Sequence, residues 1–584
     1  MLTLHENATH LIVTGKPSEL DSLSHSFRFR PEGYFYALSY DRFVVSKGED
    51  GWDGFLYPLQ RINSMTAKIL RGRKAELIRL AELEGFQLNL RHLLEYPFAS
   101  IELEDVRPDL IAGNYELDIS QRQCILDWLR VGIGFNKVTV GGGKTATFAG
   151  AAAFIKEHYD TARFLYVTPS ERLVRQVTHE MKKFLPDFEI GQCGGGKREF
   201  AAKDMVVCTV AMLSRNFDTL KAQQWFETFM AVLYDEVHHA GSKTSKKVLL
   251  SIPAYFRLGA SDTGKEDSLV RWNDVQGLFG PLLNEVHAAP LITSGRLARP
   301  HIYVVDLPEW AGRMREVPYR PELGSPAFML LDGDWVTGTY AGPVYERNKK
   351  GVIQTKRIKT STKGDDGEWL FMDKPLTVPG LHQIAINGIE HEIESRWCLL
   401  ERMYDRAIIQ FKSRNRLIVE WAAYFSRQRW STVVVATRTT HVYILEALLT
   451  KRLGAKKVNI LVGEASPAER DEMFAWFKST PGAVLITPLI KEGVSINEIR
   501  ALIVADYVGD YEVARQIIGR AMRPKQGKDN RAHVVWFWDK QHPVLRRGCG
   551  QIFNKLEKVE GFQFWHPCAG PETVFPDDFR SSVT

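Results

Sequence analysis

The chain has 584 residues, more than one hydrophobic core usually supports, so several domains are expected. Hydrophobic residues make up 44% and charged residues 25% of the chain, which argues against an intrinsically disordered protein. There are 76 lysines and arginines against 70 acids, and the resulting net charge of +6 permits a polyanionic partner without requiring one.

The cysteines and the N-terminus bear on location. Six cysteines are scattered without a Cys-x-x-Cys pair, which argues against a zinc ribbon or a disulfide framework and fits a reducing compartment. Residues 1–6 lack the charged and apolar segments of a signal peptide, and no run of 18 apolar residues occurs. We therefore expect a soluble protein that stays inside the cell.

Residues 1–112 are predicted to form a small α+β domain. Alternating residues at 26–30 and 34–38 predict two short strands, separated by the turn formers Pro31-Glu32-Gly33. Residues 67–84 carry apolar positions at helical spacing, and Gly85 follows as a C-cap. The basic residues of that helix, Arg71 among them, are interpreted as a solvated face.

The pattern changes at about residue 113 to short apolar runs that alternate with helical stretches, which is typical of a parallel α/β sheet. This first α/β unit is predicted to span 113–310. Each of its expected strands is followed by polar residues, and ligands bind such sheets at the carboxyl ends of the strands. The expected strands are 137–140, 164–167, 205–208 and 232–234.

A β-rich module is predicted at 311–395, with hairpin turns at 331–334 and 386–389. Between Tyr345 and Lys363 it holds seven cations and one acid. Contact with phosphates and a solvated loop both remain open for this segment. Its cations include Lys349, Lys350, Lys356 and Arg357.

A second α/β unit is predicted at 396–550, followed by a tail at 551–584. Its expected strands are 432–435, 458–461, 483–486 and 501–504. The sequence therefore predicts two α/β units in tandem, with a small N-terminal domain before them and a β module between them.

Residues 138–145, Val-Thr-Val-Gly-Gly-Gly-Lys-Thr, are interpreted as a phosphate-binding loop. Gly141, Gly142 and Gly143 allow a tight turn whose N–H groups point inward, at the positive end of the following helix. Lys144 is expected to reach the β- and γ-phosphates, and Thr145 to ligate Mg²⁺. Val138 stands where the full pattern has its first glycine, and a glycine-rich turn that merely starts a helix is the alternative.

Two further clusters carry chemistry. Asp235 and Glu236 directly follow an apolar strand, where adjacent carboxylates are costly unless a cation or a substrate uses them. We expect Asp235 to hold Mg²⁺, Glu236 to polarise the attacking water, and His238 to sense the γ-phosphate or couple to the other unit. The alternative is an acidic surface loop.

In the second unit, Gln516, Arg520 and Arg523 are spaced i, i+4 and i+7, so one face of a helix would carry all three. Alone, such a face would be a solvated surface. Opposite the phosphate loop it would supply arginines to a nucleotide across the cleft, with Gln516 positioning water or phosphate.

With these clusters in order, the chain resembles superfamily 2 helicases and translocases of the Asp-Glu-x-His type. Within that superfamily it is most similar to phage recombination helicases of the UvsW type, and more distantly to XPB-like and RecG-like enzymes. The similarity covers about 113–310 and 396–540. Residues that match further motifs are Gln121, Thr168, Pro169, Arg172, Thr209, Ser261, Thr263, Arg438, Thr487 and Gly493. One departure is Asp262, which replaces the alanine of the usual Ser-Ala-Thr and leaves the efficiency of coupling in doubt.

The resemblance implies two tandem RecA-like P-loop domains that use ATP and Mg²⁺ to move on DNA. Gln121 would read adenine, and Ser261, Thr263 and Gly493 would couple hydrolysis to motion. The nucleic-acid backbone would be gripped by Thr168, Pro169, Arg172, Thr209, Arg438 and Thr487.

The UvsW-like character implies branched DNA as partner, in fork regression, branch migration and R-loop removal during recombination and repair. It also implies a monomer in the cytoplasm of a bacterial or phage-infected cell, associated with the nucleoid. An RNA helicase, a restriction-type double-strand translocase and an ATP-gated clamp that does not unwind DNA remain alternatives.

Overall fold

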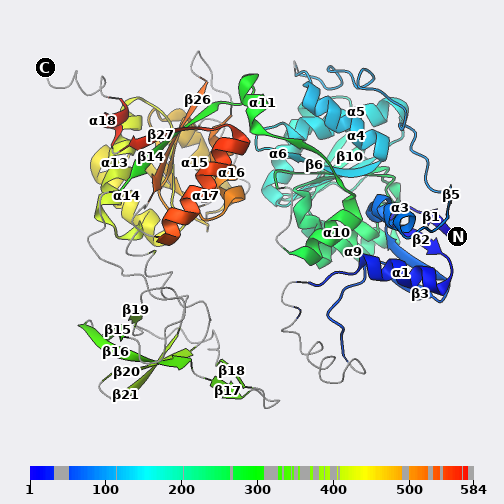
Figure 1. Ribbon diagram of the computed structural model, residues 1–584. Coiled ribbons are helices and arrows are strands. Elements are labelled where there is room, and N and C mark those ends of the chain that lie inside the picture. Colours follow the sequence, from blue (N-terminus) through cyan, green and yellow to red (C-terminus); the bar gives the residue numbers. More distant parts are fainter. Residues whose placement is uncertain are drawn as a thin grey trace.

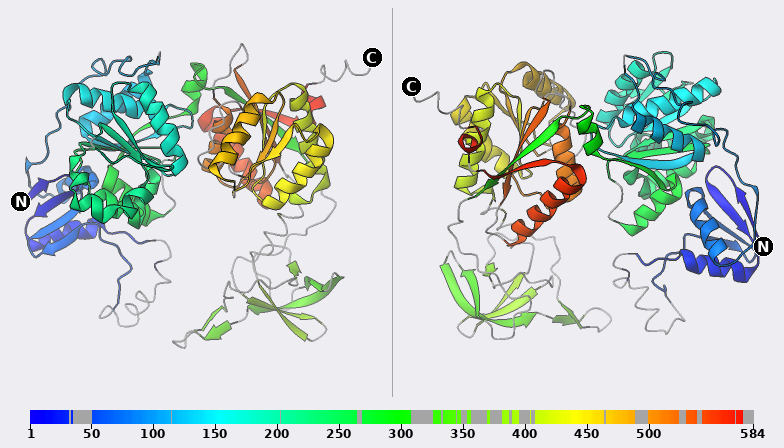
Figure 2. Two further views of the ribbon diagram at one scale, coloured as in Figure 1. Left: turned by 180° about the vertical axis from the view of Figure 1, so that it is seen from behind. Right: turned by 45° about the horizontal axis from the view of Figure 1, so that its top comes forward.

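The computed structural model comprises two α/β units side by side, with a small domain at the outer side of the first (Figures 1 and 2). No helix among the described residues is both long and apolar enough to cross a membrane. The structure describes residues 1–31, 34, 51–113, 115–201, 203–263, 268–307, 326–331, 334–343, 345–347, 353–355, 369–371, 381–386, 389–394, 404, 408–463, 465–488, 499–523, 530–538, 543–568 and 570–575.

The N-terminal domain is a five-stranded sheet packed against two helices. Strands β1, β2, β3 and β4 pair antiparallel, while β5 runs parallel to β1 at one edge. Leucines of β1 and β2 form its core with apolar residues of the helices. The elements are β1 (Leu2–Glu6), β2 (His10–Thr14), α1 (Pro17–Phe27), β3 (Gln60–Asn63), β4 (Thr66–Leu70), α3 (Lys74–Leu83) and β5 (Leu88–His92).

Two predictions in this domain are wrong. The expected helix at 67–84 begins only at Lys74, because Ala67 and Ile69 are buried on alternate positions and pair with β2 as strand β4. The expected strand at 26–30 overlaps helix α1, which buries Phe27. The strand expected at 34–38 lies almost wholly outside the described residues. Gly85 follows α3 with φ +74°, as expected of a C-cap glycine.

Arg71 is buried at the contact with the first α/β unit, which corrects its interpretation as a solvated residue. Its guanidinium lies 3.2 Å from Glu6 and donates to the carbonyls of Ala254 (3.3 Å) and Tyr255 (2.6 Å). A Cβ at Gly72 would collide with the backbone of helix α10. The small domain is therefore fixed to the first unit by hydrogen bonds from the buried Arg71 and by a close backbone contact at Gly72.

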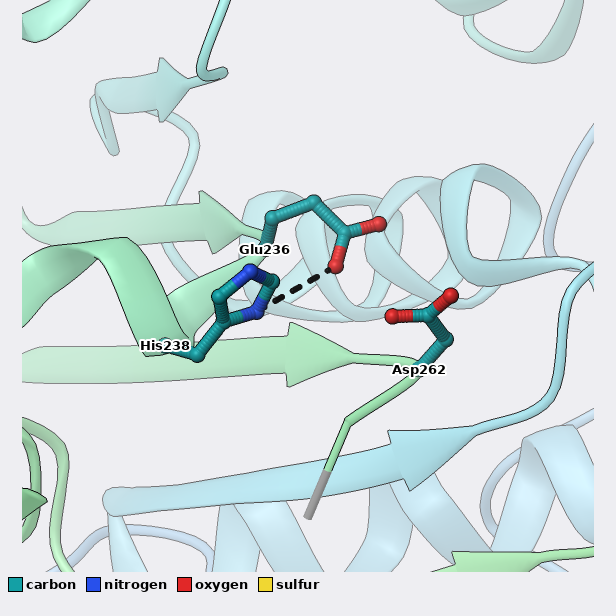
Figure 3. A group of neighbouring side chains, drawn as sticks. All are labelled: Glu236, His238 and Asp262. Carbon is teal, nitrogen blue, oxygen red and sulfur yellow. Dashed lines mark ion pairs between the residues drawn. The ribbon is translucent and has the colours of Figure 1, made fainter. Parts of the chain in front are cut away.

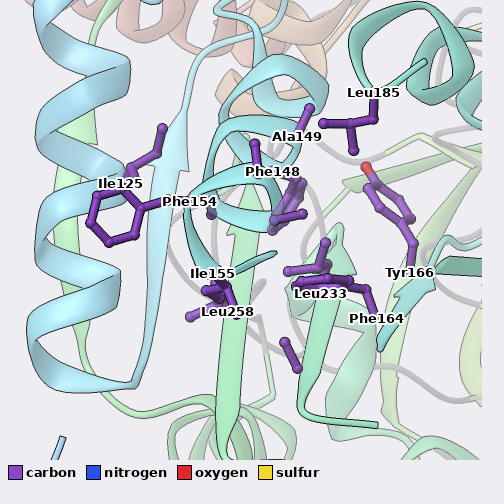
Figure 4. Packing of buried hydrophobic residues seen from close by; sticks show 14 of the residues in the cluster. Ile125, Phe148, Ala149, Phe154, Ile155, Phe164, Tyr166, Leu185, Leu233 and Leu258 are labelled. Atoms are coloured by element: carbon purple, nitrogen blue, oxygen red, sulfur yellow. The ribbon is translucent and has the colours of Figure 1, made fainter. Parts of the chain in front are cut away.

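The first α/β unit has an eight-stranded sheet in the order β13-β6-β12-β11-β7-β10-β8-β9, parallel except for β9. This confirms the expected parallel sheet. The apolar helix α5 packs on it beside Phe164, Tyr166 and Leu233 (Figure 4). The strands are β6 (Ile133–Val138), β7 (Phe164–Val167), β8 (Ile190–Gly194), β9 (Lys197–Arg198), β10 (Met205–Cys208), β11 (Ala231–Asp235), β12 (Phe256–Ser261) and β13 (Leu282–Val286).

Helices cover both faces of this sheet. They are α4 (Ile119–Val131), α5 (Lys144–His158), α6 (Glu171–Phe184), α7 (Val210–Arg215), α8 (Phe217–Ala222), α9 (Lys243–Leu250), α10 (Leu269–Phe279) and α11 (Ala288–Thr293).

The second α/β unit has seven parallel strands in the order β23-β24-β22-β25-β26-β14-β27. The strands are β14 (Arg299–Asp306), β22 (Thr432–Val435), β23 (Val458–Ile460), β24 (Val484–Thr487), β25 (Ala501–Val504), β26 (Arg531–Trp538) and β27 (Gln563–Cys568). The helices are α13 (Lys412–Arg427), α14 (Thr439–Leu453), α15 (Pro467–Ser479), α16 (Tyr511–Ala521), α17 (Pro543–Glu560) and α18 (Pro571–Val574).

One segment lies in a different unit from the one expected, and the tail, whose place the sequence leaves open, joins the second unit. Strand β14 was assigned to the first unit with range 113–310, yet it pairs between β26 and β27, and its Ile302 and Val304 join the second core. The tail at 551–584 contributes β27 to the same sheet. The apolar residues of both segments predict strands, which must pair within a sheet. Sequence periodicity does not show which of the two sheets they join.

The β module is antiparallel, as expected. Strands β15 and β16 pair from Leu331 and Asp334 outward, and β20 and β21 pair from Ile386 and Ile389 outward, at both predicted hairpins. Its strands are β15 (Pro326–Leu331), β16 (Asp334–Pro343), β17 (Tyr345–Arg347), β18 (Ile353–Thr355), β19 (Trp369–Phe371), β20 (Leu381–Ile386) and β21 (Ile389–Glu394).

Candidate functional site

The glycine loop joins strand β6 to helix α5, as the sequence predicted. Gly141 and Gly143 have φ values of +78° and +85°, which side chains with a Cβ rarely adopt, so glycine is required there. Lys144 is the first residue of α5, and Thr145 is the second. The loop therefore presents the positive end of a helix at the carboxyl edge of the sheet.

The two acids lie directly opposite this loop. Asp235 ends strand β11, and Glu236 follows with φ +53°, a conformation that is costly for a residue other than glycine. The ammonium of Lys144 forms a short ion pair with Glu236, and its Nζ lies 3.7 Å from Asp235. Loop and acids thus form one site, in place of the solvated acidic loop that was the alternative.

The electrostatics of this site are unbalanced. Burial raises the pKa of Asp235 to about 6, although Lys144 opposes the shift. Burial would also raise the pKa of Glu236, but the ion pair with Lys144 outweighs it and the pKa is lowered. For Lys144, burial lowers the pKa, and the surrounding carboxylates more than reverse that. Glu236 is therefore held ionised, whereas Asp235 is ionised at a cost.

His238, Ser261 and Thr263 connect the acids to the end of strand β12. His238 Nδ1 lies 2.7 Å from Ser261 Oγ, which donates to Glu236 at 3.2 Å and lies 3.0 Å from Thr263 Oγ1. Figure 3 shows Glu236, His238 and Asp262 turned toward one another. Their nearest ligand atoms all lie within 4.8 Å, a spacing suited to a divalent cation.

Gln121 lies beside the loop at the start of α4. It forms a capping box with Asp118, and its amide donates to the carbonyl of Gly143 at 3.3 Å and to Tyr115 Oη at 3.0 Å. Arg296, which sequence reasoning missed, donates to Tyr115 Oη at 2.8 Å and pairs with Asp118. No motif marks Arg296, because it stands in the segment between α11 and β14.

Helix α16 of the second unit packs directly on the glycine loop, since a Cβ at Gly519 would lie 2.7 Å from the Cβ of Val140. Gln516 donates to Asp262 at 3.2 Å. Arg520 lies near enough to Glu236 to lower the pKa of that carboxyl. Its Nε is buried with no hydrogen-bond partner among the described residues. The helix therefore presents Gln516 and Arg520 to the acids of the first unit.

Arg523 departs from the predicted helix face. Helix α16 ends at Ala521, because Arg523 precedes Pro524 and a residue before proline disfavours helical geometry. Burial and then Arg520 lower the pKa of Arg523, so the two guanidinium groups remain neighbours. Within the described part of the chain, neither arginine forms an ion pair.

The candidate nucleic-acid residues follow the strands as expected, but several hydroxyls are turned inward. Thr168, Thr209 and Thr487 are buried. Thr209 caps α7, and Thr487 donates to the carbonyl of Leu461 at 2.8 Å. Pro169 is the second residue after the end of β7.

The two arginines of this set contact aromatic rings. Arg172 stacks on the Phe474 ring of the second unit at 4.7 Å, and Arg438 on that of Tyr404 at 5.4 Å. Arg172 thus bridges the two units. Five predicted residues lie outside the described ones: Lys349, Lys350, Lys356, Arg357 and Gly493.

Comparison with known families agrees with this geometry. Residues 115–266 match the model described as type III restriction enzyme, res subunit, and residues 413–525 match the helicase conserved C-terminal domain. Both matched segments are domains found in helicases, which supports a superfamily 2 helicase. The two α/β units are accordingly tandem RecA-like domains.

Two curated relatives are similar over part of the chain. One is "Putative helicase 22" of Sulfolobus islandicus filamentous virus, 25% identical over 240 residues, which are 39% of this chain and 42% of the relative. The other is "DNA 3'-5' translocase XPB2" of Sulfurisphaera tokodaii, 28% identical over 160 residues, which are 27% of this chain and 33% of the relative. The chain spans less than half the length of each.

Solved structures resemble the chain loosely. UvsW of phage T4 is 16% identical, with 97% of this chain and 98% of that chain covered and a TM-score of 0.38. A fragment of an HsdR subunit of a type I restriction enzyme from Vibrio vulnificus is 13% identical, with 84% and 81% covered and a TM-score of 0.48.

Proposed function

We propose that this helicase hydrolyses ATP to move on DNA, and that it remodels branched DNA in recombination and repair. The observation that carries the ATP site is the meeting of two units at one edge. Lys144 and the acids come from the first unit, and Arg520, with its buried unpartnered Nε, comes from the second. A buried Nε–H that has no partner among the described residues fits an anionic ligand, and phosphate is such a ligand.

The residues also fit Mg²⁺. Asp235, Glu236 and Asp262 gather three carboxylates around Lys144, and a divalent ion would offset part of their negative charge. Thr145 and Asp235 would hold the ion, and Gly141, Gly142, Gly143 and Lys144 would hold the phosphates. When bound, Mg²⁺ neutralises charge that develops on the transferred phosphoryl group.

The remaining roles follow from proton and charge placement. Glu236, kept ionised by Lys144, accepts a proton from the attacking water, and Gln516 orients that water. Arg520 and Arg523 stabilise negative charge on the phosphoryl oxygens. A hydrogen-bonded group links Glu236 to the end of β12 and would transmit a change in the position or protonation of Glu236; it consists of His238, Ser261 and Thr263. Gly493 is proposed to act with this group. Gln121 orients adenine beside Gly143.

The proposed DNA path crosses the carboxyl edges of both sheets. Thr168, Pro169, Arg172 and Thr209 serve the first unit, and Arg438 and Thr487 the second, mainly through phosphates. Lys349, Lys350, Lys356 and Arg357 are proposed to add phosphate contacts. The N-terminal domain, fixed to the first unit through Arg71, would hold one arm of a junction at a constant angle to the motor.

A restriction-type double-strand translocase is the second candidate. The match of residues 115–266 to a restriction-enzyme res subunit favours it. Both candidates use the same ATP site, and they differ in whether a junction or a plain duplex stimulates turnover most.

The deciding experiment measures ATP turnover with no polymer, single-stranded DNA, linear duplex, a synthetic four-way junction and RNA, each over a salt series. Our proposal predicts the largest stimulation by the junction, weakening as salt rises because phosphate contacts release counterions. Greatest stimulation by linear duplex would favour the translocase, and by RNA an RNA helicase. Equal turnover with every polymer and with none would refute a nucleic-acid motor.

A Glu236→Gln variant separates a motor from an ATP-gated clamp. In a motor it should still bind ATP and DNA, while junction migration stops, because the water loses its base. If Glu236→Gln abolishes ATP turnover and the protein's effect on junctions persists, the clamp is the correct description.

A further inference from the structure

Asp262 is the residue of the site that its motif does not explain. It stands where the usual Ser-Ala-Thr motif has alanine, directly after Ser261 at the end of β12, and its side chain is buried. There it is the third carboxylate beside Lys144, after Asp235 and Glu236. A buried carboxylate next to two others costs free energy unless other groups satisfy it.

Lys144 and His238 of the first unit offset this charge in part, and two further donors to Asp262 come from the second unit. Gln516 donates from Nε2 to Asp262 Oδ1 at 3.2 Å. Arg515 donates from Nη2 to the backbone carbonyl of the same residue. Both donors lie on α16, so one residue of the first unit accepts hydrogen bonds from two neighbouring residues of the second.

Arg515 is itself held firmly. It is buried, its Nη2 lies 2.8 Å from Glu512 and its Nε lies 3.8 Å from Glu560, whose carboxylate also accepts from Tyr511 at 2.9 Å. The arginine is therefore anchored in the second unit and extends to the first. This contact sets where α16 stands relative to β12.

We infer that Asp262 is a positioning residue that ties α16 to the catalytic edge of the first unit and holds Gln516 beside Glu236. This rests on the proposed function for its effect on turnover, but the contact between the units is independent of it. The part that matters is the acceptor oxygen, so asparagine replaces aspartate at this position, whereas alanine does not.

The contact is tested by the distance between the units, measured without nucleotide. Nitroxide labels are placed on Lys221→Cys and Lys456→Cys, which are both exposed and lie one in each unit. Double electron–electron resonance then measures the distance between the two labels. All variants also carry Cys398→Ser and Cys568→Ser, so that these native cysteines are not labelled. We expect a narrow distribution for the parent and for Asp262→Asn, and a broader one for Asp262→Ala, which loses the Gln516 bond but keeps the Arg515 bond to the backbone carbonyl. Asp187→Ala, an exposed carboxylate of the same unit, is the matched control and should not change the distribution.

Turnover gives the second readout. With DNA, Asp262→Ala should lower kcat for ATP about tenfold, the effect of losing one hydrogen bond to a charged group, with KM changed less than about twofold. Asp262→Asn should restore kcat. A narrow distribution in Asp262→Ala, or an Asp262→Asn that behaves like alanine in either readout, overturns the inference. If the parent hydrolyses no ATP with any polymer, the proposed function fails, and the distances still decide the contact.

Discussion

The two RecA-like units place a buried aspartate at the same point, the carboxyl end of a central strand, and treat it in opposite ways. Asp235 is the last residue of β11 in the first unit, and Asp506 lies two residues after the end of β25 in the second. Asp506 accepts from the backbone N–H groups of Thr437 and Arg438, from the Thr437 hydroxyl at 2.8 Å, and contacts His441. Asp235 accepts from the Glu236 N–H at 3.0 Å, and among the described residues its other polar neighbour within 4 Å is the ammonium of Lys144, at 3.7 Å.

The pKa values follow this difference. Burial would raise the pKa of Asp506, but His441 and Thr437 outweigh it and lower the pKa. Burial prevails at Asp235 and raises the pKa to about 6. One fold position therefore carries a satisfied, structural carboxylate in the second unit, and in the first a carboxylate whose bonding capacity is left for a ligand.

The largest expected effect concerns the site around Asp235, where bonding capacity is left for a ligand. Arg520→Ala should lower DNA-stimulated ATP turnover by about 10³- to 10⁵-fold, as when an arginine finger is removed. Its melting temperature should match the parent, because among the described residues Arg520 makes no ion pair. Turnover assays and thermal melts of the same preparation check both. Arg520→Lys is the control, and it should remain impaired because an ammonium lacks the planar fork. A clear loss of melting temperature would mean that Arg520 is structural.

The next effect concerns the satisfied side. Asp506→Ala should destabilise the second unit by about 3–5 kcal/mol, because it leaves His441 and the Thr437 donors buried and unpaired. Asp235→Ala should destabilise the first unit far less, while abolishing turnover. Denaturant unfolding of both variants measures this contrast. Equal loss of stability in the two would erase the distinction between the positions.

The sequence predicted this division in part. Short apolar runs ending in polar residues located the strands and the edge on which Lys144, Asp235 and Glu236 meet, because each feature is local. Asp506 was not singled out, since its partners Thr437 and His441 lie more than sixty residues away and no motif joins them. Arg71 was interpreted wrongly for a related reason. Its position fits a helical pattern in the sequence, and only the packing of the two domains shows that the side chain is buried and not on a solvated helix face.

The sequence also did not predict to which unit some strands belong. Residues 299–306 and 563–568 have strand-like composition, and both join the second sheet. In the sequence, one segment precedes the main part of the second unit and the other follows it. Pairing between such distant segments depends on which sheet edge is open, a property of the folded chain. The helix at 516–523 was predicted from spacing, whereas its end depended on Pro524.

A smaller effect follows from the pKa of Asp235. Since burial raises it to about 6 in the folded chain, above the value of 3.8 for a free aspartate, ionisation of this group costs stability. That cost is fully present above pH 6 and disappears as the pH falls toward 4. Asp235→Asn should therefore stabilise the first unit by about 1–3 kcal/mol at pH 7.5 and by much less at pH 4.5. Thermal unfolding at the two pH values checks this, and a gain that is independent of pH would show that Asp235 does not titrate as described.

The smallest effect concerns Arg296, which extends from the segment before β14 to the adenine side of the site. It holds Tyr115 and Asp118, the neighbours that orient Gln121. Arg296→Ala should raise KM for ATP about fivefold and leave kcat unchanged, the effect of one net hydrogen bond on binding alone. Steady-state turnover with ATP and GTP tests it, because a disoriented Gln121 should also discriminate less between the two purines. Gln121→Ala should show a larger loss in the same direction. A lowered kcat with unchanged KM would instead place Arg296 in the movement of the two units, since its segment leads directly into the second sheet.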